Sequence, residues 1–292
     1  MTHEQRHLSN QNIKTAFFLN AFFTVFELVG GYFTNSIAIT TDAIHDLGDT
    51  IALGSSWYLD SFSKKPRSKI YSYGFGRFSL LSALVTGLVL LIGTVIALSE
   101  AIPRLVRPEH SDSQGMIGIA LVGICINGVS AYRLKSGQTM SEKIVSLHVL
   151  EDVGGWIAVL IAGIVMHFTD IHILDPALSV LFAFYILWNV LKNLKKTVGL
   201  FLQEVPEGIS FEHISQELLK DSAIKAVHDI HAWTLDGERN IVTMHVVTAG
   251  SASAKDVTDV KCTVKKHLAR MHIQHSTIEV EREGEICQLD DC

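Results

Sequence analysis

Residues 36–61 form an apolar stretch long enough to cross a lipid bilayer, yet the stretch contains four ionisable side chains. These side chains are Asp42, His45, Asp46 and Asp49. An ionisable group at membrane depth costs free energy unless it faces a protein interior or a water-filled cavity, so such groups mark functional sites. The stretch therefore predicts a membrane helix that carries a site, not one that only anchors the chain.

The spacing of these residues indicates a metal site. His45 and Asp49 are four residues apart, so they lie one turn apart on the same face of a helix. A second apolar segment, residues 144–168, repeats this spacing with His148 and Asp152. One such pair could be an internal hydrogen bond, but two copies favour a shared ion. Two imidazole nitrogens and two carboxylate oxygens would fill the four tetrahedral positions that zinc prefers.

Other acidic residues in the apolar segments have different expected roles. Asp42 precedes His45 by three residues, so it is a candidate for an outer-shell or proton-carrying group. Asp46 and Glu151 point about 100° away from their neighbouring ligands. Glu27, in the first apolar segment, is expected to act in packing or gating rather than in direct ligation.

The composition implies a chain that is partly inside a membrane. Of 292 residues, 48% are hydrophobic and 18% are charged, which is too apolar for an ordinary soluble domain and too charged for a chain that is membrane throughout. Apolar runs of about twenty residues predict six spans. They cover residues 13–33, 36–61, 79–101, 114–135, 144–168 and 174–193. Asp175 and Pro176 are expected to be the N-cap and first helical residue of the sixth span.

The distribution of lysine and arginine predicts the orientation. An even number of spans puts both termini on one side of the membrane. Basic residues gather between spans two and three, between spans four and five, and after span six. The positive-inside rule therefore predicts that both termini are cytoplasmic, as in an integral protein of the cell (inner) membrane. The first residues lack the features of a cleaved secretory signal, so the first span should be retained.

The remaining chain predicts a small soluble domain. The predicted organisation is an N-terminal tail (1–12), a transmembrane domain (13–204), a cytoplasmic domain with candidate metal ligands (205–284) and an acidic tail with two cysteines (285–292). Hydrophobic periodicity predicts helix 211–221, strands 226–236 and 240–248, helix 254–270 and strand 275–281. This αββαβ order predicts an α+β fold with a ferredoxin-like open antiparallel sheet.

Histidines and acids on these strands suggest a second metal site. His231 and His245 flank the predicted turn and would face each other across a hairpin with a loop of about three residues. On the last strand, His275 and Glu281 alternate to one face, together with Thr277 and Glu279. A histidine in a soluble domain is usually only a surface residue, and that alternative stays open here.

The C-terminal tail offers two thiols. Cys287 and Cys292 have a loose spacing for zinc, and His3 and His7 at the other end of the chain could complete such a site. The four cysteines of the chain are too dispersed for a disulfide framework, which suits a reducing compartment.

With these features together, the chain resembles the cation diffusion facilitator family, in particular its zinc-transporting branch. The resemblance rests on TDAIHDLGD (41–49), YSYGFGR (71–77), SLHVLEDVGGW (146–156), LDPALS (174–179) and HDIHAWTL (228–235). It implies a homodimeric antiporter that moves a divalent cation out of the cytoplasm against protons.

The resemblance also implies the ligand sets. The transport ligands would be His45, Asp49, His148 and Asp152, and the cytoplasmic sensing ligands would be His231, His245, Glu281 and either His272 or His275, with spacing in favour of His275. The branch often has Cys-x2-Cys in its tail, and the wider gap here departs from that pattern.

Ligand chemistry then suggests a mechanism. Imidazole and carboxylate hold a metal only when deprotonated, so metal and protons exchange at one site. Nitrogen ligands favour Zn²⁺, Cd²⁺, Co²⁺ and Ni²⁺ over harder ions. Zn²⁺ is therefore expected both as the substrate and as a ligand of the cytoplasmic domain, and no nucleic-acid partner is expected.

An intramembrane zinc hydrolase is disfavoured, because HExxH is absent and protein ligands fill all four positions, so no enzymatic activity is expected. A membrane metal sensor or scaffold that binds zinc without transport is the main alternative.

Overall fold

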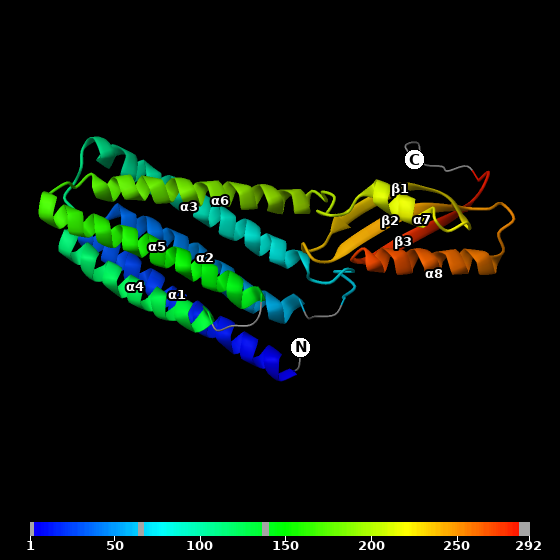
Figure 1. Cartoon of the computed structure of the whole chain (residues 1–292), viewed down its shortest axis with the longest axis horizontal. Helices are drawn as coiled ribbons and strands as arrows, with labels where there is room; N and C mark the ends of the chain where they lie inside the picture. Colours follow the sequence, from blue (N-terminus) through cyan, green and yellow to red (C-terminus); the bar gives the residue numbers. More distant parts are fainter. Residues whose placement is uncertain (1–2, 64–66, 136–139, 286–292) are drawn as a thin grey trace. The chain divides into compact units, whose positions relative to one another are not determined.

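The computed structural model contains six long helices between residues 3 and 201 (Figure 1). It describes the backbone of residues 3–63, 67–135 and 140–285, and the side chains of residues 17–55, 58, 67–129 and 150–285. Within that description the long helices are α1 (His3–Thr34), α2 (Ile37–Ser63), α3 (Arg77–Val106), α4 (Ser113–Lys135), α5 (Met140–Thr169) and α6 (Leu174–Phe201). Each contains most or all of one predicted span.

Four of these helices are long and apolar enough to cross a membrane over their described residues. The qualifying stretches are Phe17–Thr34, Arg77–Val106, Leu150–Thr169 and Leu174–Phe201. Helix α4 has a shorter apolar stretch, Ser113–Val129, and α2 carries the acidic residues. The predicted membrane domain of apolar helices is confirmed, whereas the count of six spans stays a prediction.

Glycines let the helices approach closely. A Cβ atom on Gly93 of α3 would lie 2.5 Å from Ile44 Cγ2 of α2, and one on Gly87 would lie 2.5 Å from Leu194 Cδ2 of α6. Small residues at such positions allow helix backbones to pack tightly in an apolar solvent. Helix α3 therefore contacts both α2 and α6 at its glycines.

A buried aromatic cluster joins the other helices. Trp156 of α5 is fully buried and packs edge-to-face on Phe23 of α1, with ring centroids 5.9 Å apart. Ile39 of α2 and Met116 of α4 belong to the same cluster. The helix that carries Asp152 is thus held against its neighbours one turn beyond that residue.

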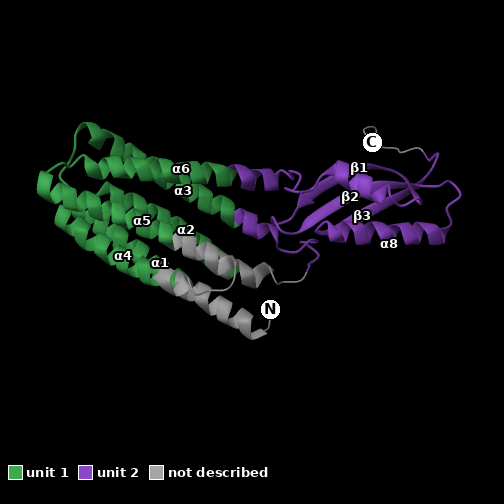
Figure 2. Cartoon of the chain, viewed as in Figure 1, with its two compact units in different colours: residues 1–62, 82–194 green, residues 63–81, 195–292 purple. Residues whose placement is uncertain are grey.

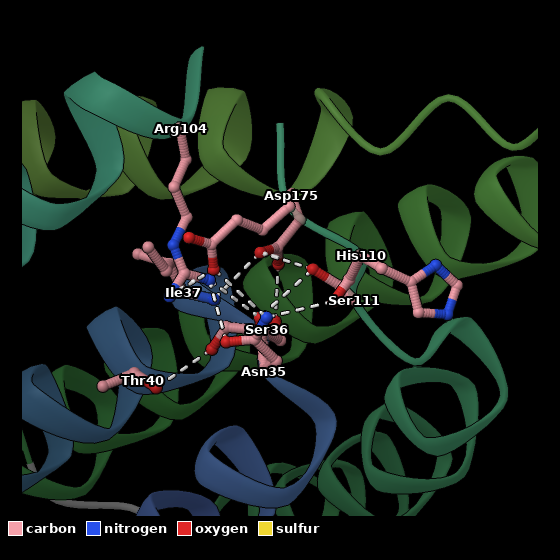
Figure 3. Close-up of polar contacts among 9 residues, drawn as sticks. Asn35, Ser36, Ile37, Thr40, Arg104, His110, Ser111 and Asp175 are labelled. Atoms are coloured by element: carbon pink, nitrogen blue, oxygen red, sulfur yellow. Dashed lines mark hydrogen bonds and ion pairs between the residues drawn. The ribbon is translucent and has the colours of Figure 1, made fainter. Parts of the chain in front are cut away.

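Asp175 ties the start of α6 to the start of α2 (Figure 3). Its buried carboxylate accepts hydrogen bonds from Ser36 Oγ (2.5 Å), the Ile37 amide (2.9 Å), the Ala38 amide (3.2 Å) and Ser111 Oγ (3.3 Å). The prediction that Asp175 is the N-cap of α6 was wrong. Helix α6 begins at residue 174, and the Asp175 carboxylate instead caps the free amides of α2.

The C-terminal part contains α7 (Phe211–Leu218), β1 (Ile224–Thr234), β2 (Asn240–Thr248), α8 (Ala254–Arg270) and β3 (Ile273–Arg282). This order confirms the predicted αββαβ arrangement. The three strands lie in the order β1-β2-β3; β1 and β2 are antiparallel, but β2 and β3 are parallel. The prediction of an all-antiparallel sheet was wrong, because α8 is a crossover that returns the chain to run parallel to β2.

Two compact units divide the chain (Figure 2). One contains residues 1–62 and 82–194, and the other contains residues 63–81 and 195–292. The loop that contains Tyr73 and Gly76 belongs to the second unit, together with the sheet. Tyr73 packs edge-to-face on His275, with ring centroids 5.6 Å apart, and the Arg239 guanidinium lies against Gly76.

Candidate metal centres

The first candidate centre lies on α2. His45 Nε2 and Asp49 Oδ2 are 3.8 Å apart, and their side chains are 28% and 27% exposed. The helix therefore presents both groups on one partly accessible face, as their spacing predicted. One divalent ion could contact both groups after a small adjustment, because zinc lies about 2.0–2.2 Å from its nitrogen and oxygen ligands.

Helix α5 faces this part of α2 at a defined level. A Cβ atom on Gly155 of α5 would lie 3.9 Å from Asp42 Oδ1 of α2. The two helices run in opposite directions, because Asp175, which follows soon after the end of α5, caps the start of α2. Three residues onward from Asp42 and three back from Gly155 lie His45 and Asp152.

The same count places the other pair of predicted ligands. Seven residues onward from Asp42 and seven back from Gly155 lie Asp49 and His148. Both helices rise about 1.5 Å per residue, so each predicted ligand on α2 has a predicted ligand on α5 at its own level. The backbone of α5 at His148 is described, whereas the His148 side chain lies outside the described residues.

Further acids surround this centre. Asp42 lies close enough to three other carboxylates to be repelled by their charges, namely those of Asp46, Asp49 and Asp152. Glu27 of α1 is completely buried and lies near Asp42, Asp46 and Asp152. Such a concentration of negative charge at membrane depth requires a cation or bound protons.

Helix α1 is joined to α2 beside these acids. Asn20 Nδ2 donates to the Asp46 carbonyl oxygen and to Thr50 Oγ1, each at 3.0 Å. Thr24 and Thr50 hydroxyls are 3.2 Å apart. A polar contact between helices replaces hydrogen bonds that lipid cannot provide, so these contacts fix α1 against the α2 face that carries Asp46.

The second candidate centre lies on the sheet. His228 of β1, His245 of β2 and Glu281 of β3 offer ligand atoms that all lie within 4.8 Å of one another. His228 Nε2 is 2.9 Å from Glu281 Oε2, and His245 Nδ1 is 2.7 Å from Glu281 Oε1. His245 and Glu281 are buried and His228 is half-buried. Two imidazoles and a carboxylate form a donor set that suits zinc.

More carboxylates lie on the other side of the His245 ring. Its Nε2 atom is 3.4 Å from Asp229 Oδ2 and 3.5 Å from Glu279 Oε2. Asp229 has a positive φ of 49°, a conformation that is uncommon outside glycine, although aspartate tolerates it better than most residues. Asp229 lies in the irregular stretch between His228 and His231, where the register of β1 against β2 shifts.

The predicted pairing of His231 with His245 was wrong. His231 lies opposite Thr243, and His228 lies opposite His245. The connection from Thr234 to Asn240 is longer than the predicted loop, and a bulge between His228 and His231 shifts the register again. Sequence reasoning therefore missed His228, although it belongs to the HDIH motif that supported the resemblance.

The other predicted ligands of this centre have different neighbours. His231 Nε2 is 2.7 Å from Asp229 Oδ1, and the His275 ring lies against Tyr73. His272 occupies the turn between α8 and β3 with a φ of 59°. Of the predicted set, the structure brings together His245 and Glu281. The tail hypothesis concerns Cys287, Cys292 and the side chains of His3 and His7, which lie outside the described residues.

Comparison with known proteins identifies the family. Residues 13–202 match the cation efflux transmembrane domain, and residues 206–283 match the cytoplasmic domain of cation efflux proteins. The chain belongs to the cation efflux family. This family consists of transporters, and the recognition made from the sequence motifs is confirmed.

Three of the chain's similar relatives are bacterial proteins named as metal transporters or metal efflux proteins. The metal cation efflux system protein CzcD of Cupriavidus metallidurans is 31% identical over 283 residues, covering 96% of this chain and 89% of its own. The zinc transporter ZitB of Escherichia coli is 28% identical over 300 residues, covering 100% and 94%. The cadmium, cobalt and zinc/H(+)-K(+) antiporter of Bacillus subtilis is 25% identical over 289 residues, covering 97% and 93%.

Proposed function

We propose that this cation efflux protein exports Zn²⁺ from the cytoplasm in exchange for protons, by alternating access of a site formed by His45, Asp49, His148 and Asp152. Cd²⁺, Co²⁺ and Ni²⁺ are further candidate substrates, because nitrogen ligands suit them as well. The protein works as a homodimer in the cell (inner) membrane with both termini in the cytoplasm. Its C-terminal part matches the cytoplasmic domain of cation efflux proteins, a domain named for dimerisation, which supports the homodimer.

One observation supports the proposal: Gly155 of α5 lies at the level of Asp42 of α2, because a Cβ atom on Gly155 would be 3.9 Å from Asp42 Oδ1. Counting along the two antiparallel helices from this level would bring the four proposed ligands to neighbouring levels. A mixed pair of nitrogen and oxygen donors from each helix would complete a tetrahedral shell. A full shell of protein ligands leaves no open position for the activated water that a catalytic zinc needs, which argues against a hydrolase.

Proton coupling follows from the chemistry of these ligands. An imidazole and a carboxylate bind a cation in their deprotonated forms, so protons compete with Zn²⁺ for His45 and Asp49. Asp42 of α2 and the buried Glu27 of α1 add two carboxyl groups to the same helices and offer places where protons can reside. Rocking of the helices that exposes the site to one face at a time would let the proton gradient drive export.

The cluster of His228, His245 and Glu281 is proposed as a zinc-sensing site of the cytoplasmic domain. Its three donors come from three different strands, so a bound ion would hold the sheet in one arrangement. We propose that the occupied domain favours the transporting form of the dimer. The relatives named as zinc transporters support zinc as the physiological ion.

Sealed vesicles test the proposal. The purified full-length chain is reconstituted around a zinc-sensitive dye, Zn²⁺ is added outside, and a pH step makes the vesicle interior acidic. The expected result is zinc entry that requires the pH gradient and stops when an ionophore dissipates it. Protein-free vesicles serve as the leak control.

The outcome separates transport from the main alternative. Zinc binding without entry would support a membrane metal sensor or scaffold and reject export. Zinc entry that is independent of the proton gradient would reject antiport.

A further inference from the structure

Two histidines meet at the end of the bundle where α2 and α6 begin. His110, in the connection between α3 and α4, and His172, between α5 and α6, have ring centroids 4.5 Å apart at an interplanar angle of 71°. His110 Nδ1 lies 3.0 Å from His172 Nε2. We call this contact the outer histidine pair. Neither residue belongs to the two centres described above.

Short hydrogen-bonded loops hold the outer histidine pair. Asn35 Nδ2 donates to the His110 carbonyl oxygen at 3.0 Å, and Ser111 Oγ donates to the Asn35 carbonyl oxygen at 3.1 Å. The His172 amide donates to the carbonyl oxygen of Asp170, which has a φ of 53°. In Figure 3 the His110 ring points away from the Asp175 network, so its nitrogens are not used there.

Acidic residues lie beside the pair in the chain. Glu109 precedes His110, with its carboxylate 3.1 Å from the Arg104 guanidinium, and Asp170 lies two residues before His172. His110 is exposed and His172 is half-buried, so an ion can reach the rings from solvent. Among the described residues, His172 Nδ1 is a buried nitrogen with no hydrogen-bond partner, so the ring makes its polar contact through Nε2, with His110.

We propose that the outer histidine pair is a binding site for a divalent cation of the nitrogen-preferring class, with Zn²⁺ as the test ion. Two Zn–N bonds of about 2.0–2.1 Å at a tetrahedral angle separate the nitrogens by about 3.3 Å. At 3.0 Å the two nitrogens share a hydrogen bond, so an ion would displace that proton to solvent, and the rings would tilt until both lone pairs point at the ion while the nitrogens open by a few tenths of an ångström. Water molecules complete the shell, and the ion bridges the α3–α4 and α5–α6 connections.

The location gives the site a consequence. In the proposed orientation this end of the bundle faces the compartment into which the cargo is released. The site therefore meets cations after their exit and ties two connections together when occupied. Binding itself can be measured without transport, so failure of the vesicle assay and failure of this proposal are distinguishable.

Chemical protection tests the site residue by residue. The full-length protein is treated with diethyl pyrocarbonate, which acylates free imidazole nitrogens, with and without Zn²⁺, and labelling at each histidine is measured by mass spectrometry. Zn²⁺ should lower the labelling of His110 and His172 several-fold, whereas Mg²⁺ should not. His213, an exposed histidine on α7, is the internal reference for non-specific quenching.

Three variants make the result decisive. In His172→Gln the protection of His110 should disappear, and in His110→Gln the protection of His172 should disappear. In Asp49→Ala, which lacks a proposed transport ligand, both should remain protected. The proposal is overturned by unprotected histidines in the wild type, by His110 still protected in His172→Gln, or by protection lost in Asp49→Ala, which would mean that reagent access follows the transport site.

Discussion

The two candidate metal centres differ in how their ligands are brought together. On α2, His45 and Asp49 are neighbours because a helix places residues four apart on one face. On the sheet, His228, His245 and Glu281 come from three strands and meet only through strand pairing. Local spacing therefore predicts the first arrangement, whereas the second depends on loop length and on a bulge.

The largest effect is expected at the helical centre. Asp49→Ala removes one proposed ligand of the transported ion. Because loss of even a hydrogen-bond partner of a metal ligand costs about 10–100-fold, zinc-for-proton exchange should fall by at least about 100-fold. Exchange is measured in proteoliposomes by dye fluorescence after a pH step.

A matched variant controls for reconstitution. Asp259→Ala changes an exposed aspartate of α8 and should leave exchange unchanged. Retained exchange in Asp49→Ala, at equal protein incorporation, would remove His45 and Asp49 as a functional pair.

The next effect shows whether His228 or His231 is the zinc ligand beside His245 on the sheet. His228→Ala should weaken zinc binding at the cytoplasmic centre by at least about tenfold, because one of three ligands is lost. His231→Ala, three residues along the same strand, should change it little, since His231 contacts Asp229 outside the cluster. Zinc affinity is measured by dye competition in the full chain with Asp49→Ala and His172→Gln present, which remove the transport site and the proposed outer site.

If His231→Ala weakened zinc binding more than His228→Ala, the pairing of His231 with His245 predicted from the sequence would be restored.

The same two variants, made without Asp49→Ala or His172→Gln, test regulation. If occupancy of the cluster activates transport, only His228→Ala should remove the part of the rise with cytoplasmic zinc concentration that exceeds simple substrate saturation.

A smaller effect concerns packing around the helical centre. In Gly123→Ala the new methyl group would collide with the buried Trp156 ring, so unfolding should be easier by about 1–3 kcal/mol. Gly118→Ala, on the same helix, meets no atom within 4 Å and should be neutral or stabilising by up to about 1 kcal/mol. Thermal unfolding followed by tryptophan fluorescence measures both. Equal melting temperatures would show that α4 and α5 separate more easily than this packing implies.

The smallest effect is local and belongs to the cytoplasmic domain. Ser253 hydrogen bonds in the capping box of α8 lower the pKa of Asp256. A lowered pKa means that the ionised group stabilises the fold above its unfolded-state pKa, and that this contribution is lost as pH falls through the folded-state value. Asp256→Asn should thus speed amide exchange in the first turn of α8 at neutral pH, with the difference from wild type vanishing in acid. A difference that grows in acid would contradict the cap.

Much of the fold could be predicted from sequence, because its signals are local. The apolar runs predicted helices α1–α6, and the strand over residues 240–248 and the helix over 254–270 were predicted with the bounds observed. Asp175 was misassigned because its carboxylate caps a helix more than a hundred residues away. No local pattern distinguishes a residue that caps its own helix from one that caps another.

The sequence by itself determined that apolar helices carry paired histidines and aspartates and that an αββαβ domain follows them. Spacing along a helix and alternation along a strand are properties of the chain alone. Only the tertiary structure decided that Gly155 faces Asp42, that His228 replaces His231 opposite His245, and that His110 meets His172. These contacts join residues far apart in the chain, so they depend on packing, bulges and loop lengths that no short stretch of sequence specifies.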